Sequence, residues 1–448
     1  MALAPGVRMS NYRDIYKQKL VTPDAAISLI EDNSNLILSM SASMPPALMA
    51  AIGNKASQGG YECLNLYYMH STQAAAETLI RADLMDVIHP HPLFMSVFDR
   101  MLADTGRKQG KDWVDFIPCM FHQAGRLLTE NISPDSFVVT VSPMDKAGYF
   151  SLGTNADYGA TVVRHAKNVI VEVNKHMPRT FGECLVHVND VHQIVENDVP
   201  LMQGVMGPPG ETDIAIAKQI AERIPDAATL QMGIGAIPNI VLAELANHND
   251  LGLHTELFST PMVPLIKSGV ISGRKKSVMP LKHVYTLAIG DEETYDFMDD
   301  NPSIVGYPAD WVNAPAVIRK NDRMISVNAA LEVDLTGQIN AESIGGLPYS
   351  GTGGQLDFVR GAYSSKGGKS FIAMRSATKG GAASKIVPKI QGGSITDTRM
   401  DTHYVVTEHG MVNLKGRSLN ERAELLIGIA HPDYRDELRE AAVSMNLL

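Results

Sequence analysis

One carboxylate in an apolar run is the residue most suited to covalent chemistry. Residues 251–260 read Leu-Gly-Leu-His-Thr-Glu-Leu-Phe-Ser-Thr, and Glu256 is the only acid among them. Glycine-rich turns lie upstream at residues 232–239 and downstream at residues 351–358. A carboxylate can act as a nucleophile where water is excluded and donors await the developing oxyanion. Glu256 is therefore a candidate nucleophile, and the alternative is an ordinary strand-end acid that pairs on the surface.

An internal repeat predicts how Glu256 is positioned. Three segments of the first half resemble three of the second at nearly constant offsets of 187 to 192 residues: 36–48 with 228–240, 64–70 with 251–257, and 139–148 with 328–337. We therefore predict two pseudo-repeated units, residues 1–206 and 211–448, split near residues 207–210. Met69 occupies the position that Glu256 fills in the second unit. This asymmetry favours a single active site between the units, although a structural acid would show it too.

The spacing of apolar residues predicts an α/β fold. Short β-branched runs at residues 137–141, 168–173 and 404–406 alternate with amphipathic stretches such as residues 213–224. That alternation is typical of largely parallel sheets with helical crossovers. In such sheets ligands bind at the carboxyl ends of the strands. The glycine turns and Glu256 are expected to lie there.

Composition excludes several classes of protein. The net charge of −10 argues against a nucleic-acid binder, which would present a basic face. No apolar run approaches the roughly 18 residues that span a membrane, and the N-terminus lacks a signal-peptide core. Cys63, Cys119 and Cys184 lie far apart, which indicates reduced thiols in a cytoplasmic protein. No residue spacing typical of a metal site is present, so no metal is expected.

The glycine turns favour an anionic ligand over a dinucleotide. Gly233-Ile-Gly235 begins like a dinucleotide fingerprint, but Pro238 stands where the third glycine belongs, so NAD is not expected. The turn can still bring backbone close to an anion at a helix start. Residues 351–354 can offer N–H groups to an oxyanion, or form a flexible turn. Glu408 follows an apolar strand and is either an acid–base or orienting group or a turn cap.

Together these segments resemble family I coenzyme A transferases of the acetyl-CoA hydrolase/transferase group. The resemblance is strongest to 4-hydroxybutyrate and butyryl-CoA:acetate CoA-transferases and covers nearly the whole chain. It rests jointly on residues 142–150, 172–180, 233–238, 254–256, 353–358 and 406–410. None of these segments is specific alone.

The resemblance implies a role for each matching residue. Glu256 would attack an acyl-CoA to form an acyl-glutamyl anhydride and then an enzyme–CoA thioester. Asn313 and the backbone N–H of Gly354 would bind the oxyanion, and Glu408 corresponds to a second family glutamate near the site. The implied CoA contacts are Gly233, Ile234, Gly235, Ala236, Ile237, Leu331, Gly353, Gly354 and Lys379. CoA would be a substrate rather than a tightly bound cofactor, the partners would be short-chain carboxylates, and the assembly a homodimer.

Three points stay open at this stage. An acyl-CoA hydrolase would use the same residues, with water taking the enzyme–CoA thioester. A CoA- or nucleotide-binding module without chemistry would need only the glycine turns. Residues 67–70 align with the strand of Glu256, so they either line the acyl side of the site or pack between the units.

Overall fold

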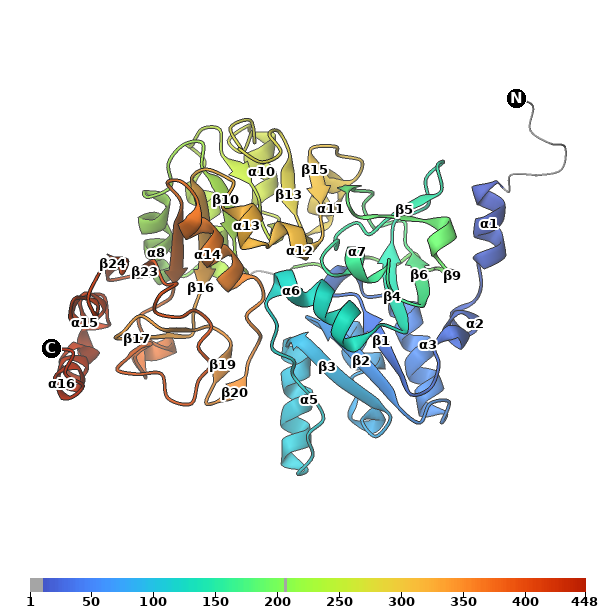
Figure 1. Ribbon diagram of the computed structural model, residues 1–448, viewed down its shortest axis with the longest axis horizontal. Helices are drawn as coiled ribbons and strands as arrows, with labels where there is room; N and C mark the ends of the chain where they lie inside the picture. Colours follow the sequence, from blue (N-terminus) through green and yellow to red (C-terminus); the bar gives the residue numbers. More distant parts are fainter. Residues whose placement is uncertain (1–10, 205–207) are drawn as a thin grey trace.

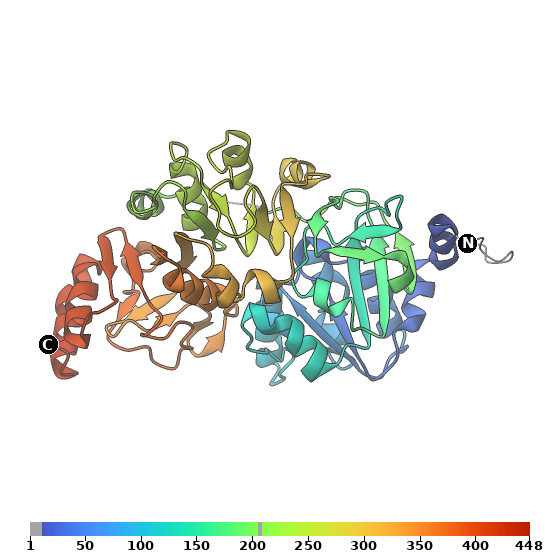
Figure 2. The same ribbon diagram turned by 45° about the horizontal axis from the view of Figure 1, so that its top comes forward.

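The chain folds into two lobes. The computed structural model describes residues 11–204 and 208–448. Figures 1 and 2 show the first half of the chain, coloured blue to green, in one lobe and the second half, yellow to red, in the other. The predicted unit boundary at residue 206 falls outside the described residues, so it stays a prediction.

A six-stranded parallel sheet forms the centre of the first lobe. Adjacent strands from β3 to β9 all pair in parallel. The strands, in spatial order, are β3 (Ile88–Phe94), β2 (Leu64–Met69), β1 (Ser34–Leu38), β4 (Ser136–Val141), β6 (Asn168–Val173) and β9 (Gln193–Glu196). The β-branched runs predicted as buried strands therefore lie in its middle.

The second lobe repeats this arrangement. Its main sheet pairs in parallel except at β23 and β24, which are antiparallel. The order is β11 (Gly252–Leu253), β10 (Thr229–Met232), β16 (Met324–Ala329), β21 (Lys369–Ala373), β23 (Tyr404–Thr407) and β24 (Gly410–Asn413). The sequence β11-β10-β16-β21 mirrors β2-β1-β4-β6, with Met69 ending β2 where Glu256 follows β11. The predicted α/β class with largely parallel sheets is confirmed.

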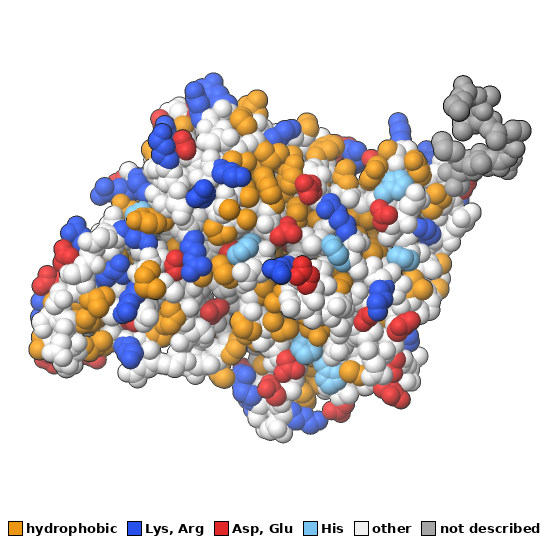
Figure 3. All heavy atoms as spheres, in the orientation of Figure 1, with side chains coloured by type: hydrophobic (Ala, Val, Ile, Leu, Met, Phe, Trp, Pro, Cys, Tyr) orange, Lys and Arg blue, Asp and Glu red, His pale blue; other side chains and the backbone are white. Residues whose placement is uncertain are grey.

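Helices cross between the strands and cover the sheets (Figure 1). They are α1 (Tyr12–Lys19), α2 (Pro23–Ala26), α3 (Pro46–Ser57), α4 (Gln73–Thr78), α5 (Val97–Lys108), α6 (Phe121–Arg126), α7 (Gly159–Val162), α8 (Glu211–Ala221), α9 (Ala236–Glu244), α10 (Met262–Lys267), α11 (Glu292–Met298), α12 (Ala309–Val312), α13 (Pro315–Ile318), α14 (Gln355–Ser364), α15 (Leu419–Gly428) and α16 (Arg435–Ser444). Within the described residues no helix is long and apolar enough to cross a membrane. On the face in Figure 3, acidic and basic side chains are interspersed rather than gathered in a stripe.

The strand predicted around Glu256 is interrupted at the acid. After β11 the chain leaves the main sheet, and β12 (Leu257–Ser259) pairs with β14 (Leu287–Ile289) in a separate two-stranded sheet. The Glu256 carbonyl accepts hydrogen bonds from the N–H groups of Thr286 and Leu287, which draws the chain aside. Glu256 therefore lies at a bend between two short strands rather than within one.

Backbone hydrogen bonds join the lobes around the second glycine turn. Phe121 at the start of α6 donates its N–H to the Gly353 carbonyl, and Met95 donates to Ser350. Strand β7 (Phe181–Gly182) of the first half also pairs with β15 (Ile304–Gly306) of the second. Residues 350–353 are thus held by the opposite lobe.

Helix α14, which begins directly after Gly354, packs closely on α13 through Gly361. A Cβ at Gly361 would lie 2.5 Å from the Ile318 Cβ. We predict that Gly361→Ala lowers the free energy of unfolding by about 1–3 kcal/mol, because overpacking outweighs the better helix propensity of alanine. Urea unfolding measures this. Gly428→Ala, where the new Cβ meets nothing within 4 Å, is the control and should not destabilise. Equal effects of the two substitutions would contradict the close packing.

Candidate active site

A cavity of about 640 Å³ opens between the lobes at the carboxyl ends of their strands. Both glycine turns contribute to its wall, and so does Glu256. The lining residues before residue 205 lie after β2, from the end of β3 into α5, and at Met202. The described residues that line it are His70–Gln73, Phe94–Phe98, Arg100, Met202, Gly233, Ile234, Glu256, Asn328, Ala329, Ala341, Tyr349–Gly353 and Gln355.

The Glu256 carboxylate is held by two donors from the second lobe. Asn313 Nδ2 donates to Glu256 Oε2 at 2.5 Å, and the backbone N–H of Gly354 donates to the same carboxylate. Asn313 is fully buried and, like Gly354, does not line the cavity. The donors therefore lie behind Glu256, whose carboxylate faces the cavity in front of them.

Burial raises the pKa of Glu256 to about 8. The hydrogen bond from Asn313 lowers the pKa, the charge of Asp357 raises it, and the Gly354 N–H lowers it. Withdrawal from water outweighs the two donors because the charged form loses most of its hydration. A strongly shifted acid in a cavity is typical of functional sites.

Only glycine fits at position 354. A Cβ there would lie 1.9 Å from Glu256 Oε2 and 2.1 Å from Asn313 Nδ2. A side chain at this position would have to displace one of these two atoms, which are hydrogen-bonded to each other. The glycine thus allows a backbone N–H to approach a carboxylate that already has a side-chain donor.

His254 links the segment of Glu256 to the turn of Asn313. Its Nε2 lies 2.8 Å from the carbonyl oxygen of Val312, directly before Asn313. Burial, aided by the charge of Lys276, lowers the pKa of His254 to about 3, so the ring is neutral. Because the partner is a carbonyl, Nε2 carries the proton and donates. This hydrogen bond fixes the segment of Glu256 relative to the segment of Asn313, whose side-chain amide donates to Glu256.

Asp357 ties the helix after Gly354 to the first lobe. Its carboxylate accepts from the His122 ring at 2.6 Å through Nδ1 and from the His122 backbone N–H at 3.1 Å. The hydrogen bond to Asp357 raises the pKa of His122, and burial raises the pKa of Asp357. His122 lies on α6 of the first lobe, and Asp357 lies in the first turn of α14, directly after Gly354. The pair therefore fixes the position of the Gly354 N–H relative to the first lobe.

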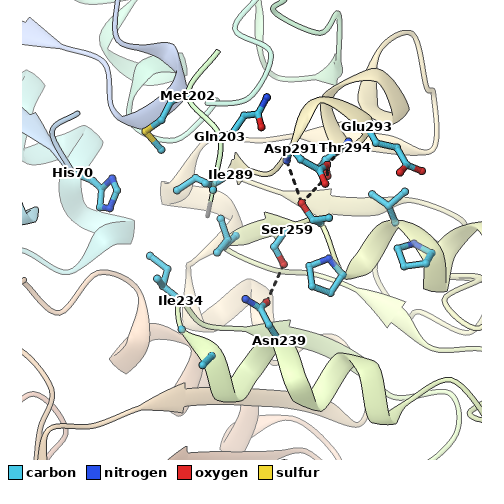
Figure 4. A pocket seen from close by; sticks show the side chains of 18 residues that line it. His70, Met202, Gln203, Ile234, Asn239, Ser259, Ile289, Asp291, Glu293 and Thr294 are labelled. Carbon is cyan, nitrogen blue, oxygen red and sulfur yellow. Dashed lines mark hydrogen bonds between the residues drawn. The ribbon is translucent and has the colours of Figure 1, made fainter. Parts of the chain in front are cut away.

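A second cavity of about 760 Å³ adjoins the first and shares His70, Met202 and Ile234 with it. Figure 4 shows His70 reaching it from the first lobe, opposite Ile234 and Asn239 around α9. Its wall also includes Gly235 and Ala236 of the first glycine turn. Gly235 has φ of 134°, which favours glycine, and caps α9.

The cavities bring together most, but not all, of the sequence-predicted residues. Gly233, Ile234, Gly235, Ala236 and Gly353 line one cavity or the other, whereas Ile237 packs in the core. Leu331, Lys379 and Glu408 line neither.

Glu408 directly follows β23 in the main sheet of the second lobe. The strands β10, β16 and β21 lie between β23 and β11, the strand that precedes Glu256. The Ser376 hydroxyl and backbone N–H both donate to the Glu408 carboxylate. Glu408 lines neither cavity, and its role as a second glutamate near the site stays a prediction.

Residues 67–70 align with the Glu256 segment in the internal repeat. Of these four residues, His70 lines both of the cavities described above and the other three line neither. Tyr68 and Met69 are buried in the core, and Tyr67 stacks on His91. His70 has φ of 44°, and its Nδ1 lies 3.0 Å from the Ser41 hydroxyl.

The sequence alone did not predict Arg100 and His122 as site residues, because neither lies in a motif. Only the packing of α5 and α6 brings them to the site.

Comparison with known proteins identifies the family. The acetyl-CoA hydrolase/transferase N-terminal domain matches residues 5–203, and the C-terminal domain of the same family matches residues 290–442. The chain therefore belongs to the acetyl-CoA hydrolase/transferase family, and the predicted membership is confirmed. Glu256 lies in the segment between the two matches.

Similar proteins are named CoA-transferases. The 4-hydroxybutyrate coenzyme A transferase of Clostridium kluyveri is 41% identical over 432 residues, covering 95% of this chain and 98% of that protein. The butyryl-CoA:acetate CoA-transferase of Anaerostipes caccae is 45% identical over 314 residues, covering 68% and 70%. Among solved structures, RipA from Yersinia pestis superposes with a TM-score of 0.95 at 45% identity, covering 98% of this chain and all of RipA. The predicted enzyme class, a CoA-transferase, agrees with these relatives.

The raised pKa of Glu256 predicts a pH-dependent stability. Between the unfolded pKa, near 4.5, and the folded pKa, about 8, the folded protein binds a proton that the unfolded chain releases. The contribution of Glu256 to the free energy of unfolding is therefore fully present below pH 4.5 and is lost as pH rises through 8. We predict that Glu256→Gln is increasingly stable relative to the unsubstituted protein from pH 5 to 8.5, measured by urea unfolding.

The exposed Glu440, changed to Gln, is the control for that series. It should leave the pH dependence of unfolding unaltered, because its carboxylate stays in solvent. A stability difference between the Glu256→Gln protein and the unsubstituted protein that does not change with pH would contradict the shifted pKa.

Proposed function

We propose that the chain transfers coenzyme A between a short-chain acyl-CoA and a free carboxylate of the acetate, butyrate or 4-hydroxybutyrate type. The reaction is ping-pong and passes through a glutamyl-CoA thioester on Glu256. The observation that carries this proposal is the Glu256 carboxylate, which faces a cavity while Asn313 and the Gly354 N–H donate to it from behind.

The first half-reaction moves CoA onto the enzyme. The deprotonated form of Glu256 attacks the thioester carbonyl through one carboxylate oxygen. The C–S bond breaks, CoA departs as its thiolate, and an acyl-glutamyl anhydride remains. The thiolate then attacks the glutamyl Cδ, and the donor acid departs as its carboxylate. The product is a thioester between Glu256 and CoA.

The second half-reaction is the reverse with a different acid. The acceptor carboxylate attacks the glutamyl thioester and expels CoA thiolate, and the thiolate attacks the acyl carbon of the new anhydride. A new acyl-CoA leaves and the Glu256 carboxylate is restored. Because each bond broken is replaced by one of similar energy, the cycle needs neither ATP nor a metal.

Asn313 and the Gly354 N–H are placed to stabilise attack by CoA thiolate or by the acceptor carboxylate on the glutamyl carbonyl of Glu256. Two steps of the cycle convert the glutamyl carbonyl oxygen into an oxyanion, and Asn313 already donates to Oε2 at 2.5 Å. Donors fixed before charge develops stabilise the transition state without reorganisation. His254 and the His122–Asp357 pair would serve by holding those donors still.

The remaining predicted contacts fit the CoA side of the site. Residues 233–236 each line one cavity or the other, Ile234 lines both, and the segment offers backbone at the start of α9. Lys379 and Glu408, which follow β21 and β23, are proposed to meet parts of CoA remote from its sulfur. Leu331 follows β16, whose Asn328 and Ala329 line the Glu256 cavity, and is proposed to contact CoA nearer to Glu256. Ile237 would support the turn from the core. A homodimer, as the family resemblance implies, stays a prediction.

Glu256→Gln tests the nucleophile directly. The amide keeps the shape of the side chain but cannot form the anhydride, so transfer from acetyl-CoA to butyrate should fall below detection. Initial rates of the unsubstituted protein should give the parallel double-reciprocal lines of a ping-pong mechanism. Full transferase activity of the Glu256→Gln protein would refute the proposal. CoA release that does not depend on an added carboxylate would indicate an acyl-CoA hydrolase.

Asn313→Leu tests the oxyanion donor. Leucine has a similar volume but no N–H, so the charge on the glutamyl oxygen loses one of its two donors. We expect kcat to fall by about 100- to 1000-fold with little change in KM. Steady-state kinetics, with the unfolding midpoint as a check on folding, measures this. A change confined to KM would assign Asn313 to ground-state binding instead.

A further inference from the structure

Gln355 presents a polar side chain to the Glu256 cavity that the proposed mechanism does not use. It is the first residue of α14 and directly follows Gly354, whose N–H donates to Glu256. A Cβ on Gly354 would lie 1.9 Å from Glu256 Oε2, and consecutive Cα atoms are about 3.8 Å apart, so the Gln355 Cα lies within about 7 Å of that oxygen. The Gln355 side chain is partly exposed and belongs to the cavity wall. Any group that it binds therefore lies close to the reacting carboxylate.

Asp397 fixes the orientation of the Gln355 amide. Gln355 Nε2 donates to Asp397 Oδ2 at 2.7 Å. Asp397 is fully buried, and its backbone exchanges hydrogen bonds with Ile339 of β18 (Ile339–Asn340), so the fold places the acceptor. Burial raises the pKa of Asp397 to about 7, and above that pH the ionised carboxylate can only accept. The NH2 group of Gln355 then faces Asp397, and the amide oxygen Oε1 points away from it.

The oxygen Oε1 of Gln355 is an acceptor that lacks a donor. Among the described residues no N–H or O–H group donates to it, and it is not among the buried atoms that are sealed from solvent. A free amide oxygen in a cavity wall suits a ligand group that carries an N–H or O–H. Ionised carboxylates and phosphates offer only acceptor oxygens, so Oε1 does not bind them.

The CoA arm of the proposed intermediate carries a suitable donor close to its sulfur. In the thioester on Glu256 the sulfur is bonded to the glutamyl Cδ, and the first secondary amide of the arm begins two carbons beyond the sulfur. The N–H of this amide is the donor nearest to the reacting bond in any acyl-CoA. Of the acids in the proposed exchange, only a hydroxy acid offers a competing donor, which is its hydroxyl group.

We propose that Gln355 Oε1 accepts the N–H of the CoA amide nearest the sulfur, and that Asp397 is the positioning residue that orients Oε1. The hydrogen bond holds the two-carbon link between amide and sulfur against the cavity wall and directs the sulfur to Glu256. This inference rests on the proposed function and adds one substrate contact to it. Gln355 is not among the CoA contacts that the family resemblance implies.

An acetyl-CoA analogue with an ester oxygen in place of that N–H tests the contact. Both donors are assayed with butyrate as acceptor at pH 8, where Asp397 is mostly ionised. For the unsubstituted protein we expect kcat/KM to be about 3- to 12-fold lower for the analogue than for acetyl-CoA, the range of one neutral hydrogen bond. Gln355→Met, which has a similar length but no amide, should lower kcat/KM for acetyl-CoA but not for the analogue. Gln355→Ala, which removes the amide without filling its place, should do the same.

The matched control is Gln338→Met. Gln338 Nε2 also donates to an aspartate, Asp334, at 2.7 Å, but Gln338 lines neither cavity. This variant should discriminate between the two donors as the unsubstituted protein does. The unfolding midpoint of each variant checks its folding.

Several results would overturn the contact. They are equal kcat/KM for the two donors in the unsubstituted protein, unchanged discrimination in the Gln355 variants, and equal losses for both donors in those variants. A loss in Gln355→Met with 4-hydroxybutyrate as acceptor but not with butyrate would assign Oε1 to the hydroxyl of the acid instead. Absence of any transfer from acetyl-CoA in the unsubstituted protein would refute the proposed function itself.

Discussion

The contact between Glu256 and its two donors is the constraint on which the rest of the site depends. The carboxylate is withdrawn from water far enough for burial to raise its pKa to about 8, and only Asn313 and the Gly354 N–H compensate. Each donor is fixed by a separate support. His254 holds the turn before Asn313, and Asp357 binds His122 from the helix after Gly354. A site of this kind is preorganised because the donors are ordered by the fold and not by the ligand.

The duplicated architecture explains why a single site arises between two similar lobes. Both lobes direct the carboxyl ends of their strands to a common cavity, but Met69 stands where the second lobe has Glu256. The second lobe provides the acid, its donors and the glycine turns. The first lobe provides His70 and Arg100, and it anchors residues 350–353 through Met95 and Phe121. The reacting group therefore comes from the second lobe alone, whereas both lobes line the cavity.

The periodicity of apolar residues, the internal repeats and the glycine turns predicted the fold class and the location of the site. The α/β class with largely parallel sheets, and the place of the glycine turns and Glu256 at the carboxyl ends of the strands, follow from local patterns in the sequence. The bend at Glu256 did not follow, because it results from hydrogen bonds to Thr286 and Leu287 thirty residues away. Arg100 and His122 were not foreseen for the same reason: each lies on an ordinary amphipathic helix and meets the site only through tertiary packing. The place of Glu408 after β23 depends on the strand order of the second sheet, which no motif encodes.

The central claim is a covalent bond between Glu256 and CoA, and reductive trapping tests it most directly. The protein is incubated with acetyl-CoA, treated with sodium borohydride, digested and mapped by mass spectrometry. Hydride reduces a glutamyl thioester to a primary alcohol and releases CoA. The account predicts this change at Glu256 alone, dependent on acetyl-CoA and absent in Glu256→Gln. A peptide containing residues 251–260 that is unmodified while transfer proceeds at full rate would contradict it.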